Sequence, residues 1–349
     1  MVRVHPGLSR VRAFPPPLSG VASLEPFTSD VLKGNPLGDP SERTIATYVP
    51  KGRSGEGLPL LVFLPGFTGG GPGVIQNEPF LGESLFRLFD RLVLSGACRP
   101  AHLVAPDCRT CLGGSQYVNS TATGPYEDYV IKEVIPWARE KFHSEHLGIL
   151  GQSSGGFGAL HLAMSHPRLF EAVGSSAGDM SFPLLFMGDF PKAARHMRGF
   201  GGPDSFIRKV LEDRSTELGP FDLNGASLLV LAMAACYSPR ANEPGAFDLP
   251  FDLETGALLP EVWQRWLAFD PLERLDRPEV QEGLRALRSL HLTASTSDEF
   301  YLDLAARQFA RKARALKIPI RHEESPGGHF LQGERFSSLF KEMVRALTA

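Results

Sequence analysis

The stretch GQSSGG at 151–156 constrains the fold of this chain more than any other feature of the sequence. It follows a mostly apolar run at 147–150 and precedes an apolar segment with helical spacing. This order predicts a strand, a sharp turn and a helix, the setting in which a GxSxG pattern holds a serine on a strained turn above a sheet. Gly151 and Gly155 lack a Cβ, so the strand and the helix can approach closely enough to form the turn. The stretch makes Ser153 a candidate nucleophile.

A second GxSxG match, GSSAG at 174–178, shows that the pattern alone does not decide the matter. No helical spacing follows it directly, and Pro183 comes soon after. The context in the rest of the chain must therefore distinguish the two serines.

Strand and helix patterns alternate along most of the chain. Strand-like segments occur at about 26–32, 43–49, 59–64, 101–106, 147–150, 170–175, 290–295 and 317–322. Helical spacing occurs at about 80–95, 124–142, 157–164, 300–315 and 334–347. This alternation predicts an α/β fold with a mostly parallel central sheet, right-handed crossovers and flanking helices.

The regular alternation is interrupted once, which divides the chain into four parts. Residues 1–24 are rich in proline and are expected to lie extended on the surface or against a partner subunit. The core is expected over 25–177 and again over 289–349. The intervening 178–288 is too long for a bare loop and is interpreted as a cap or lid insertion.

Aromatic and apolar residues in the insertion have two interpretations. The segment 180–190 is rich in Phe, Leu and Met. It could line an acyl or aromatic pocket, but packing inside the insertion is the commoner use of such a run. Trp263 and Trp266, three positions apart, are likewise interpreted as core residues rather than as a sugar-binding platform.

Charge and hydropathy limit the classes of partner. The formal net charge is -3 with acidic and basic residues interspersed, which argues against a nucleic acid or an anionic membrane as partner. No apolar run approaches the roughly 18 residues of a membrane span, and residues 1–20 contain no apolar signal region. We therefore expect a cytoplasmic protein that acts on a small molecule, with secretion of a processed form and homo-oligomer formation left open.

The four cysteines, Cys98, Cys108, Cys111 and Cys236, are too few and too unevenly spaced for a disulfide framework. This favours a reducing compartment. Cys108 and Cys111 form a CxxC pair, but no second pair or histidine cluster completes the four ligands of a structural zinc site. We interpret the pair as two loop thiols or a local disulfide, and we expect neither a metal nor an organic cofactor.

A serine nucleophile needs a base to take its proton and a carboxylate to orient that base. Asp298 follows the strand-like segment at 290–295, and His329 lies on the PGGH turn after the last one. The order serine, acid, histidine is typical of α/β-hydrolases. An Asp in this position could instead cap the helix that follows, with Glu299 and Asp303 as the alternative acids.

His291 and His322 are the other histidines late in the chain, and they fall within or at the end of their predicted strands. His329 instead lies on a glycine-flanked loop that can bring its ring over Ser153. The sequence therefore favours His329 as the base.

Two backbone N–H groups are expected to form an oxyanion hole. One belongs to Ser154, the residue after the nucleophile, and the other to Phe67, on the glycine-rich loop after the buried strand at 59–64. The glycines at 69–71 could also form a flexible turn or a phosphate loop, but no GK[ST] follows them.

With these residues placed, the chain resembles the esterase D-like branch of the α/β-hydrolases over most of its length outside the insertion. The matching motifs are PGFTGG at 65–70, GGS at 113–115 through NS at 119–120 and YED at 126–128, GQSSGGFGA at 151–159, SDEF at 297–300 and PGGH at 326–329. The resemblance implies a Ser153, Asp298 and His329 triad, with Phe67 and Ser154 as oxyanion donors. Pro65 departs from the histidine that the family often has before the glycine.

These residues together predict a serine carboxylesterase that hydrolyses a small-molecule ester through an acyl-enzyme. Within the same chemistry, an acyltransferase or a thioesterase would use the same triad. A non-catalytic binding protein on the hydrolase scaffold and a serine peptidase are the alternatives from other classes, although no peptide-anchoring feature is recognisable.

Overall fold

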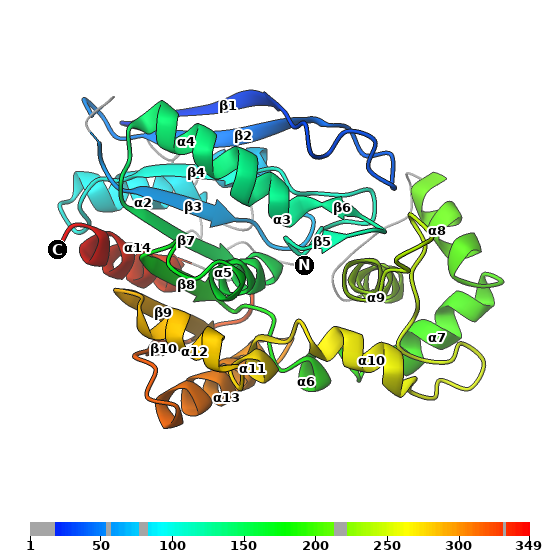
Figure 1. Cartoon of the computed structure of the whole chain (residues 1–349). Coiled ribbons are helices and arrows are strands. Elements are labelled where there is room, and N and C mark those ends of the chain that lie inside the picture. The colour runs from blue at the N-terminus through cyan, green and yellow to red at the C-terminus, as the bar shows by residue number, and fades with distance from the viewer. Residues whose placement is uncertain (1–17, 54–56, 77–82, 213–221, 331–332) are drawn as a thin grey trace, which may run out of the picture.

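An eight-stranded sheet forms the centre of the protein in the computed structural model, which describes residues 18–53, 57–76, 83–212, 222–330 and 333–349 (Figure 1). Within these ranges the strand order is β1-β2-β4-β3-β7-β8-β9-β10. The strands are β1 Val21–Thr28, β2 Glu42–Val49, β3 Leu60–Leu64, β4 His102–Pro106, β7 Leu147–Gln152, β8 Ala172–Ser176, β9 Ser289–Ser295 and β10 Arg321–Ser325. Within this sheet, only the β1–β2 and β2–β4 pairings are antiparallel. The predicted mostly parallel sheet is confirmed.

Both faces of the sheet are covered by helices, so the central strand β3 is apolar throughout. In β3, Leu60, Val62 and Leu64 pack on one face, and Leu61 and Phe63 on the other, because side chains alternate along a strand. One face carries α2 (Leu85–Leu94) and α14 (Gly333–Leu347). The other carries α4 (Ile135–Phe142), α5 (Ser154–Ser165) and α13 (Leu302–Ala315).

The helix predicted over 124–142 is built differently. The segment opens with a two-strand pairing of β5 (Asn119–Ser120) with β6 (Gly124–Pro125), and the helix begins with α3 (Tyr126–Asp128). A π-helical segment, Tyr129–Val134, then joins α3 to α4. Pro136 lies at the start of α4 and lacks the N–H that a regular α-helix would need there, which a locally wider turn accommodates.

Two strands are displaced from their predicted positions. β10 begins at Arg321 rather than at 317. The apolar Ile318, which favoured the earlier start, is buried in the connection before the strand. The strand itself is polar and partly exposed, as suits the edge of a sheet. β1 begins at Val21, so part of the segment predicted as an extended arm over 1–24 belongs to the sheet, and residues 1–17 lie outside the described ones.

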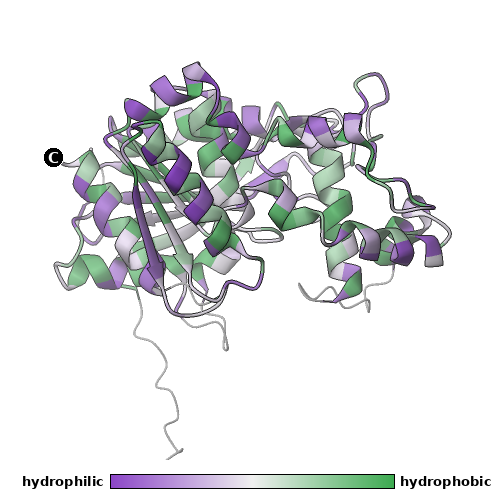
Figure 2. Cartoon of the chain, turned by 90° about the horizontal axis from the view of Figure 1, so that it is seen from below, coloured by the Kyte–Doolittle hydropathy of each residue, from purple (hydrophilic) through white to green (hydrophobic). Residues whose placement is uncertain are grey.

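The segment between β8 and β9 is helical. Its helices are α6 (Phe182–Phe186), α7 (Phe190–Gly199), α8 (Pro203–Glu212), α9 (Leu223–Tyr237), α10 (Pro260–Leu267), α11 (Pro271–Arg274) and α12 (Pro278–Arg285). The helices from α7 to α10 pack in a second core, whereas α12 packs against the main core. Helices α7 to α10 stand beside the sheet, as Figures 1 and 2 show from two directions. Trp263 and Trp266 are buried in the second core, and the Trp266 indole donates to Ser238 Oγ at 2.9 Å.

Helix α9 is apolar almost all round because it is buried on nearly every side, as the centre of this second core. It has 15 residues. Across the described ranges, no helix combines the length and the apolar character needed to cross a membrane.

Candidate active site

The sequence-predicted site residues lie at one edge of the sheet. Phe67 follows β3, Ser153 follows β7, Asp298 follows β9 and His329 follows β10. These strands are neighbours or next neighbours in the order β3-β7-β8-β9-β10, and they run parallel. Their carboxyl ends therefore meet at the same edge, where ligands bind in open α/β sheets.

The turn at Ser153 is strained, as the GxSxG pattern predicts. Ser153 has φ 53° and ψ -124°, a conformation that L-residues rarely adopt. A Cβ on Gly151 would lie 2.1 Å from the carbonyl oxygen of Gly155, and a Cβ on Gly155 would lie 1.9 Å from that of Leu64. Strand, turn and helix can approach this closely only because both positions are glycine.

The second GxSxG match has no such turn. Its central residue, Ser176, lies within β8 and is 0% exposed. A side chain enclosed in the sheet cannot reach a substrate, so the structure separates the two serines that the pattern alone could not.

His329 and Asp298 form a buried pair. His329 Nδ1 lies 2.8 Å from Asp298 Oδ2. The other carboxylate oxygen accepts the backbone N–H of Phe300 at 3.0 Å, so Asp298 both orients the histidine and caps the chain that follows it. Burial raises the pKa of Asp298, but the hydrogen bond from His329 and its charge outweigh burial and hold this pKa below its usual value.

The alternative acids do not reach the ring of His329. Glu299 Oε2 accepts the backbone N–H of His329 at 2.6 Å. Asp303 lies 3.4 Å from Arg307, in an ion pair on α13. Glu299 thus positions the backbone of the histidine, a role that the sequence did not predict.

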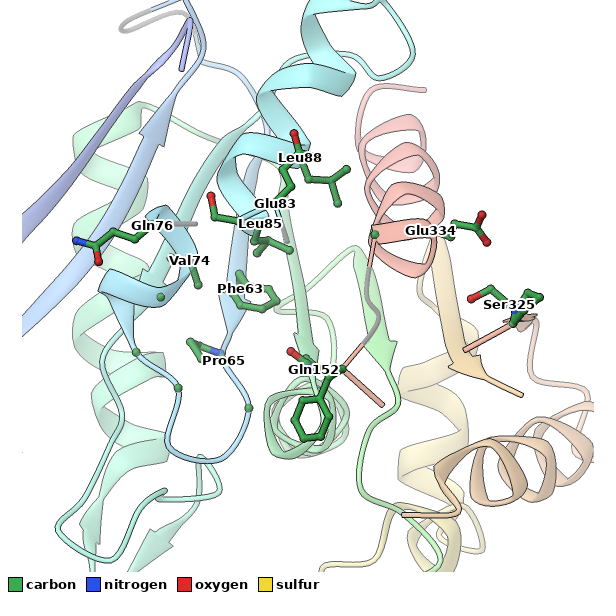
Figure 3. Close-up of a pocket in the computed structure, with 18 residues that line it drawn as sticks. Phe63, Pro65, Val74, Gln76, Glu83, Leu85, Leu88, Gln152, Ser325 and Glu334 are labelled. Atoms are coloured by element: carbon green, nitrogen blue, oxygen red, sulfur yellow. The ribbon is translucent and has the colours of Figure 1, made fainter. Parts of the chain in front are cut away.

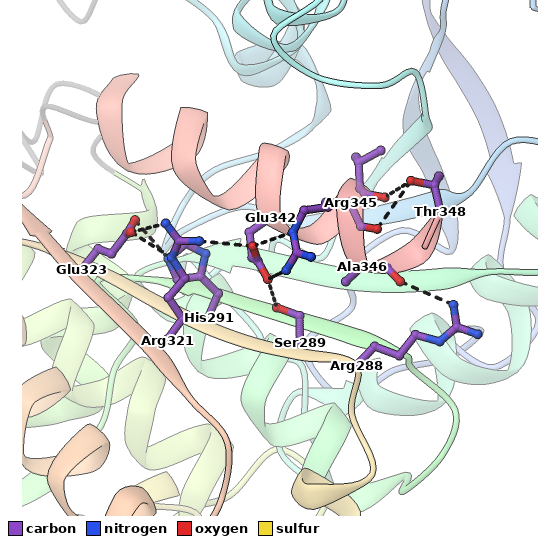
Figure 4. A network of polar contacts seen from close by, with 10 residues as sticks. Arg288, Ser289, His291, Arg321, Glu323, Glu342, Arg345, Ala346 and Thr348 are labelled. Carbon is purple, nitrogen blue, oxygen red and sulfur yellow. Dashed lines mark hydrogen bonds and ion pairs between the residues drawn. The ribbon is translucent and has the colours of Figure 1, made fainter.

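The alternative histidines lie away from the cavity that contains Ser153. His291 is 0% exposed beneath α14, and burial lowers its pKa to about 4. Its Nε2 is 3.3 Å from Glu323, at one end of a polar network in which Arg321 links Glu323 to Glu342 of α14 (Figure 4). This network holds β9, β10 and α14 together. His322 is also largely buried, which lowers its pKa.

A cavity of about 350 Å³ contains both Ser153 and His329. The other residues around it come from the loop after β3, from the elbow, from the insertion and from the segments after β9 and β10. Its apolar lining includes Phe67, Leu185, Phe186, Leu228, Leu229, Phe300, Leu302 and Phe330. The space beside the serine is therefore lined mainly by apolar side chains.

The two predicted oxyanion donors, Phe67 and Ser154, both line this cavity. Ser154 is the first residue of α5, so its N–H has no partner within the helix and lies at the positive end of the helix dipole. Phe67 lies on the loop after β3, and no backbone carbonyl among the described residues accepts its N–H. The Phe67 ring packs over Gly113, where a Cβ would lie 2.4 Å from the ring carbon Cζ. This packing fixes the loop.

The sequence analysis missed Asp179 and Gln116, two buried residues beside the elbow. Asp179 lines the cavity, and its Oδ2 accepts hydrogen bonds from Ser154 Oγ at 3.0 Å and from Gln116 Nε2 at 3.2 Å. Burial raises the pKa of Asp179 to about 6. The available signal is an acid that follows a predicted strand by a few residues, since β8 ends at Ser176.

A second cavity, of about 610 Å³, adjoins the loop after β3 (Figure 3). Its lining includes Phe63, Val74, Leu85, Leu88 and Glu334. It meets the first cavity at Gly66, Gly69, Gln152 and Phe330 but contains neither Ser153 nor His329. The chemistry is therefore expected in the smaller cavity.

The cysteines take no part in this site. Cys98, Cys108 and Cys236 are buried, Cys111 is exposed, and all four are free thiols. Of the two interpretations of the CxxC pair, the local disulfide is wrong. Among the described residues, no group of three or more His, Cys, Asp or Glu side chains is arranged to hold a metal ion.

The family of the chain follows from comparison with models of protein families. The model of the family described as "Putative esterase" matches residues 40–329, which include every candidate site residue named above. The chain belongs to this esterase family. Membership places it among the hydrolases that act on esters, as the sequence predicts. No functionally curated relative matches the sequence.

Solved structures show the same fold at low sequence identity. A ferulic acid esterase is 16% identical with a TM-score of 0.59, covering 94% of this chain and 98% of its own. An S-formylglutathione hydrolase from Agrobacterium tumefaciens is 16% identical with a TM-score of 0.58, covering 95% and 98%. The fluorophosphonate-binding serine hydrolase F of Staphylococcus aureus is 15% identical with a TM-score of 0.56, covering 93% and 98%. The protein therefore has the α/β-hydrolase fold.

Proposed function

We propose that this esterase is a serine carboxylesterase that hydrolyses a small-molecule ester through an acyl-enzyme on Ser153. One observation carries the proposal: a serine on a strained elbow shares a cavity with a histidine whose Nδ1 lies 2.8 Å from a buried carboxylate. This is the arrangement that activates a hydroxyl for nucleophilic attack.

In the first half-reaction, Ser153 Oγ attacks the ester carbonyl carbon while Nε2 of His329 takes the hydroxyl proton. Asp298 holds Nδ1 of the ring, which keeps Nε2 free to accept and stabilises the imidazolium. The tetrahedral oxyanion accepts the N–H groups of Phe67 and Ser154. When the intermediate collapses, the bond to the alcohol oxygen breaks and His329 returns the proton to the leaving alcohol.

In the second half-reaction, a water molecule takes the place of the alcohol. His329 removes a proton from the water as its oxygen attacks the acyl carbon. The bond between that carbon and Ser153 Oγ then breaks, the serine regains its proton from His329, and a carboxylic acid leaves. The residues named supply every proton transfer, so the scheme needs no metal or organic cofactor.

The insertion over 178–288 is proposed as a cap that selects the substrate. Leu185 and Phe186 of α6 and Leu228 and Leu229 of α9 line the cavity opposite the core residues. Apolar walls of this kind favour an acyl or alcohol part with hydrocarbon or aromatic character.

A fluorophosphonate probe tests the role of Ser153. We expect the probe to label the wild type and not Ser153→Ala, because the serine oxygen displaces fluoride from phosphorus only when His329 activates it. Ser176→Ala is the matched control, since it removes the serine of the other GxSxG match, and it should label normally. Failure of the wild type to label would favour a non-catalytic binding protein on this fold.

The related activities are distinguished by product analysis. A panel of p-nitrophenyl esters of increasing chain length, with methyl ferulate, reports the acyl preference. Added alcohols divert the acyl group if the enzyme is an acyltransferase, and acyl thioesters replace oxygen esters as the better substrates if it is a thioesterase. Peptide anilides should not be cleaved.

A further inference from the structure

We propose that Asp179 is a specificity residue that binds a cationic group of the ester substrate. The inference rests on the proposed esterase function and adds the chemical class of the substrate. Asp179 follows β8, the strand next to the elbow strand β7, and lines the cavity that contains Ser153 and His329. Only 5% of its surface is exposed.

Among the buried carboxylates of the described residues, Asp179 alone has neither an ionic partner nor a backbone N–H donor. Asp298 pairs with His329 and Asp107 with Arg109, at 2.8 and 2.7 Å. No described Lys or Arg lies within ion-pair distance of Asp179. A positive charge on the ring of His329 would favour the ionised form of Asp179, but this ring is already held by Asp298. A buried carboxylate without a cation is costly unless a ligand supplies one.

Asp270 shows what a structural carboxylate looks like in the same segment. It accepts three backbone N–H groups, from Ser181, Phe182 and Leu272, and uses both of its oxygens. Asp179 instead receives two side-chain donors, both on Oδ2. No described donor bonds to Oδ1, so that oxygen keeps its capacity for a ligand.

If Asp179 had only a structural role, its negative charge would work against catalysis. Its carboxylate bonds to Oγ of Ser154, the residue whose backbone N–H is proposed to hold the oxyanion. A negative charge here opposes the negative charge that develops in the transition state. A cationic group on the substrate, bound by Asp179, would neutralise that charge at the moment of reaction.

The rest of the cavity suits an alkylammonium group. Phe67, Phe186, Phe300 and Phe330 line it together with the single unpaired carboxylate of Asp179. Aromatic faces attract cations through their quadrupole. A carboxylate among them adds a Coulomb attraction that acts over a longer distance. A neutral hydrocarbon would use the aromatic surface and leave the carboxylate unpaired.

Two matched pairs of esters test the inference. The first pair, p-nitrophenyl 4-(trimethylammonio)butyrate and p-nitrophenyl 5,5-dimethylhexanoate, places the charge or its neutral isostere on the acyl side. The second pair, choline butyrate and 3,3-dimethylbutyl butyrate, places it on the alcohol side. The readout is the ratio of kcat/KM for the cationic ester to that for its neutral isostere.

In the wild type we expect this ratio to exceed one for at least one pair and to fall by about tenfold in Asp179→Asn. Asp189→Asn, which removes a charge from the insertion away from the cavity, should leave the ratio unchanged.

A structural role for Asp179 would lower kcat/KM for both esters of a pair together. An unchanged ratio in Asp179→Asn, with both neutral esters hydrolysed by the wild type, overturns the inference alone. Absence of any hydrolysis by the wild type overturns the proposed function.

Discussion

Glu299 holds the backbone of His329 while its neighbour Asp298 holds the ring. The Glu299 carboxylate accepts the backbone N–H of His329 at 2.6 Å, and Asp298 Oδ2 lies 2.8 Å from Nδ1. Gly328 completes the arrangement, since a Cβ there would lie 2.4 Å from Glu299 Oε1. Two adjacent acids after β9 thus fix a loop that follows β10.

We expect Glu299→Ala to lower kcat by about tenfold, because the loop of His329 loses its anchor and the ring is less often in position. Glu299→Gln keeps an oxygen that can accept the N–H and should retain most of the activity. Steady-state kinetics on a p-nitrophenyl ester measures both. Full activity in Glu299→Ala would show that Asp298 positions the histidine unaided.

Asp298→Asn should lower kcat by about 10³- to 10⁴-fold with a much smaller effect on KM, because an amide neither fixes the productive tautomer nor stabilises the imidazolium. Circular dichroism and thermal unfolding establish that the variant folds. A loss below tenfold would mean that another group supports the base, and Asp298 would then be only a helix cap.

Gly155→Ala is expected to destabilise the protein by several kcal/mol or to prevent folding. The new Cβ would lie 1.9 Å from the carbonyl oxygen of Leu64, and backbone atoms cannot yield as a flexible side chain can. Gly188→Ala is the control, since no atom lies within 4 Å of the added Cβ. Urea unfolding compares the two, and equal stability would contradict the close approach of β3 and α5.

Asp179→Asn should be more stable than the wild type at pH 8, with the difference shrinking as the pH falls toward 4. Burial raises the pKa of Asp179 from 3.8 to about 6 in the folded state. The folded protein therefore binds more protons between these values, and stability is lost as pH rises through this window. The full cost, about 3 kcal/mol for a shift of this size, is present above pH 6.

Urea unfolding of both proteins at several pH values measures this difference. Asparagine can still accept from Ser154 and Gln116, so the hydrogen bonds are largely kept. A difference in unfolding free energy that does not depend on pH would contradict this account, as would a variant that is less stable than the wild type at pH 8. Either result would show that burying the charge of Asp179 does not destabilise the protein.

Local patterns were enough to predict the core and the candidate triad. The buried strands were evident as apolar runs because both of their faces are covered, and the elbow because its geometry demands glycine at two fixed positions. Ser153, Asp298 and His329 each follow a predicted strand. Because the carboxyl ends of parallel strands meet at the same edge of a sheet, all three are expected there. The roles of these residues in catalysis stay a prediction.

What the sequence could not predict depends on contacts between distant segments. Gln116 reaches Asp179 only because the fold brings the segment after β4 next to the segment after β8. The edge strand β10 has neither an apolar run nor a clear alternation of apolar and polar residues. The nearby Ile318 and Ile320 have the strand-like pattern instead, and they predict a strand that begins too early, at 317. The arrangement of the helices of the insertion is set by their mutual packing, which periodicity does not encode.

Whether Ser153 carries the acyl group is decided by mass spectrometry of the enzyme quenched with acid during turnover of a p-nitrophenyl ester. The predicted result is a mass increase of one acyl group, located by peptide mapping on Ser153, and absent in Ser153→Ala. Hydrolysis that continues in Ser153→Ala, or an acyl group found on another residue, would contradict the proposed mechanism.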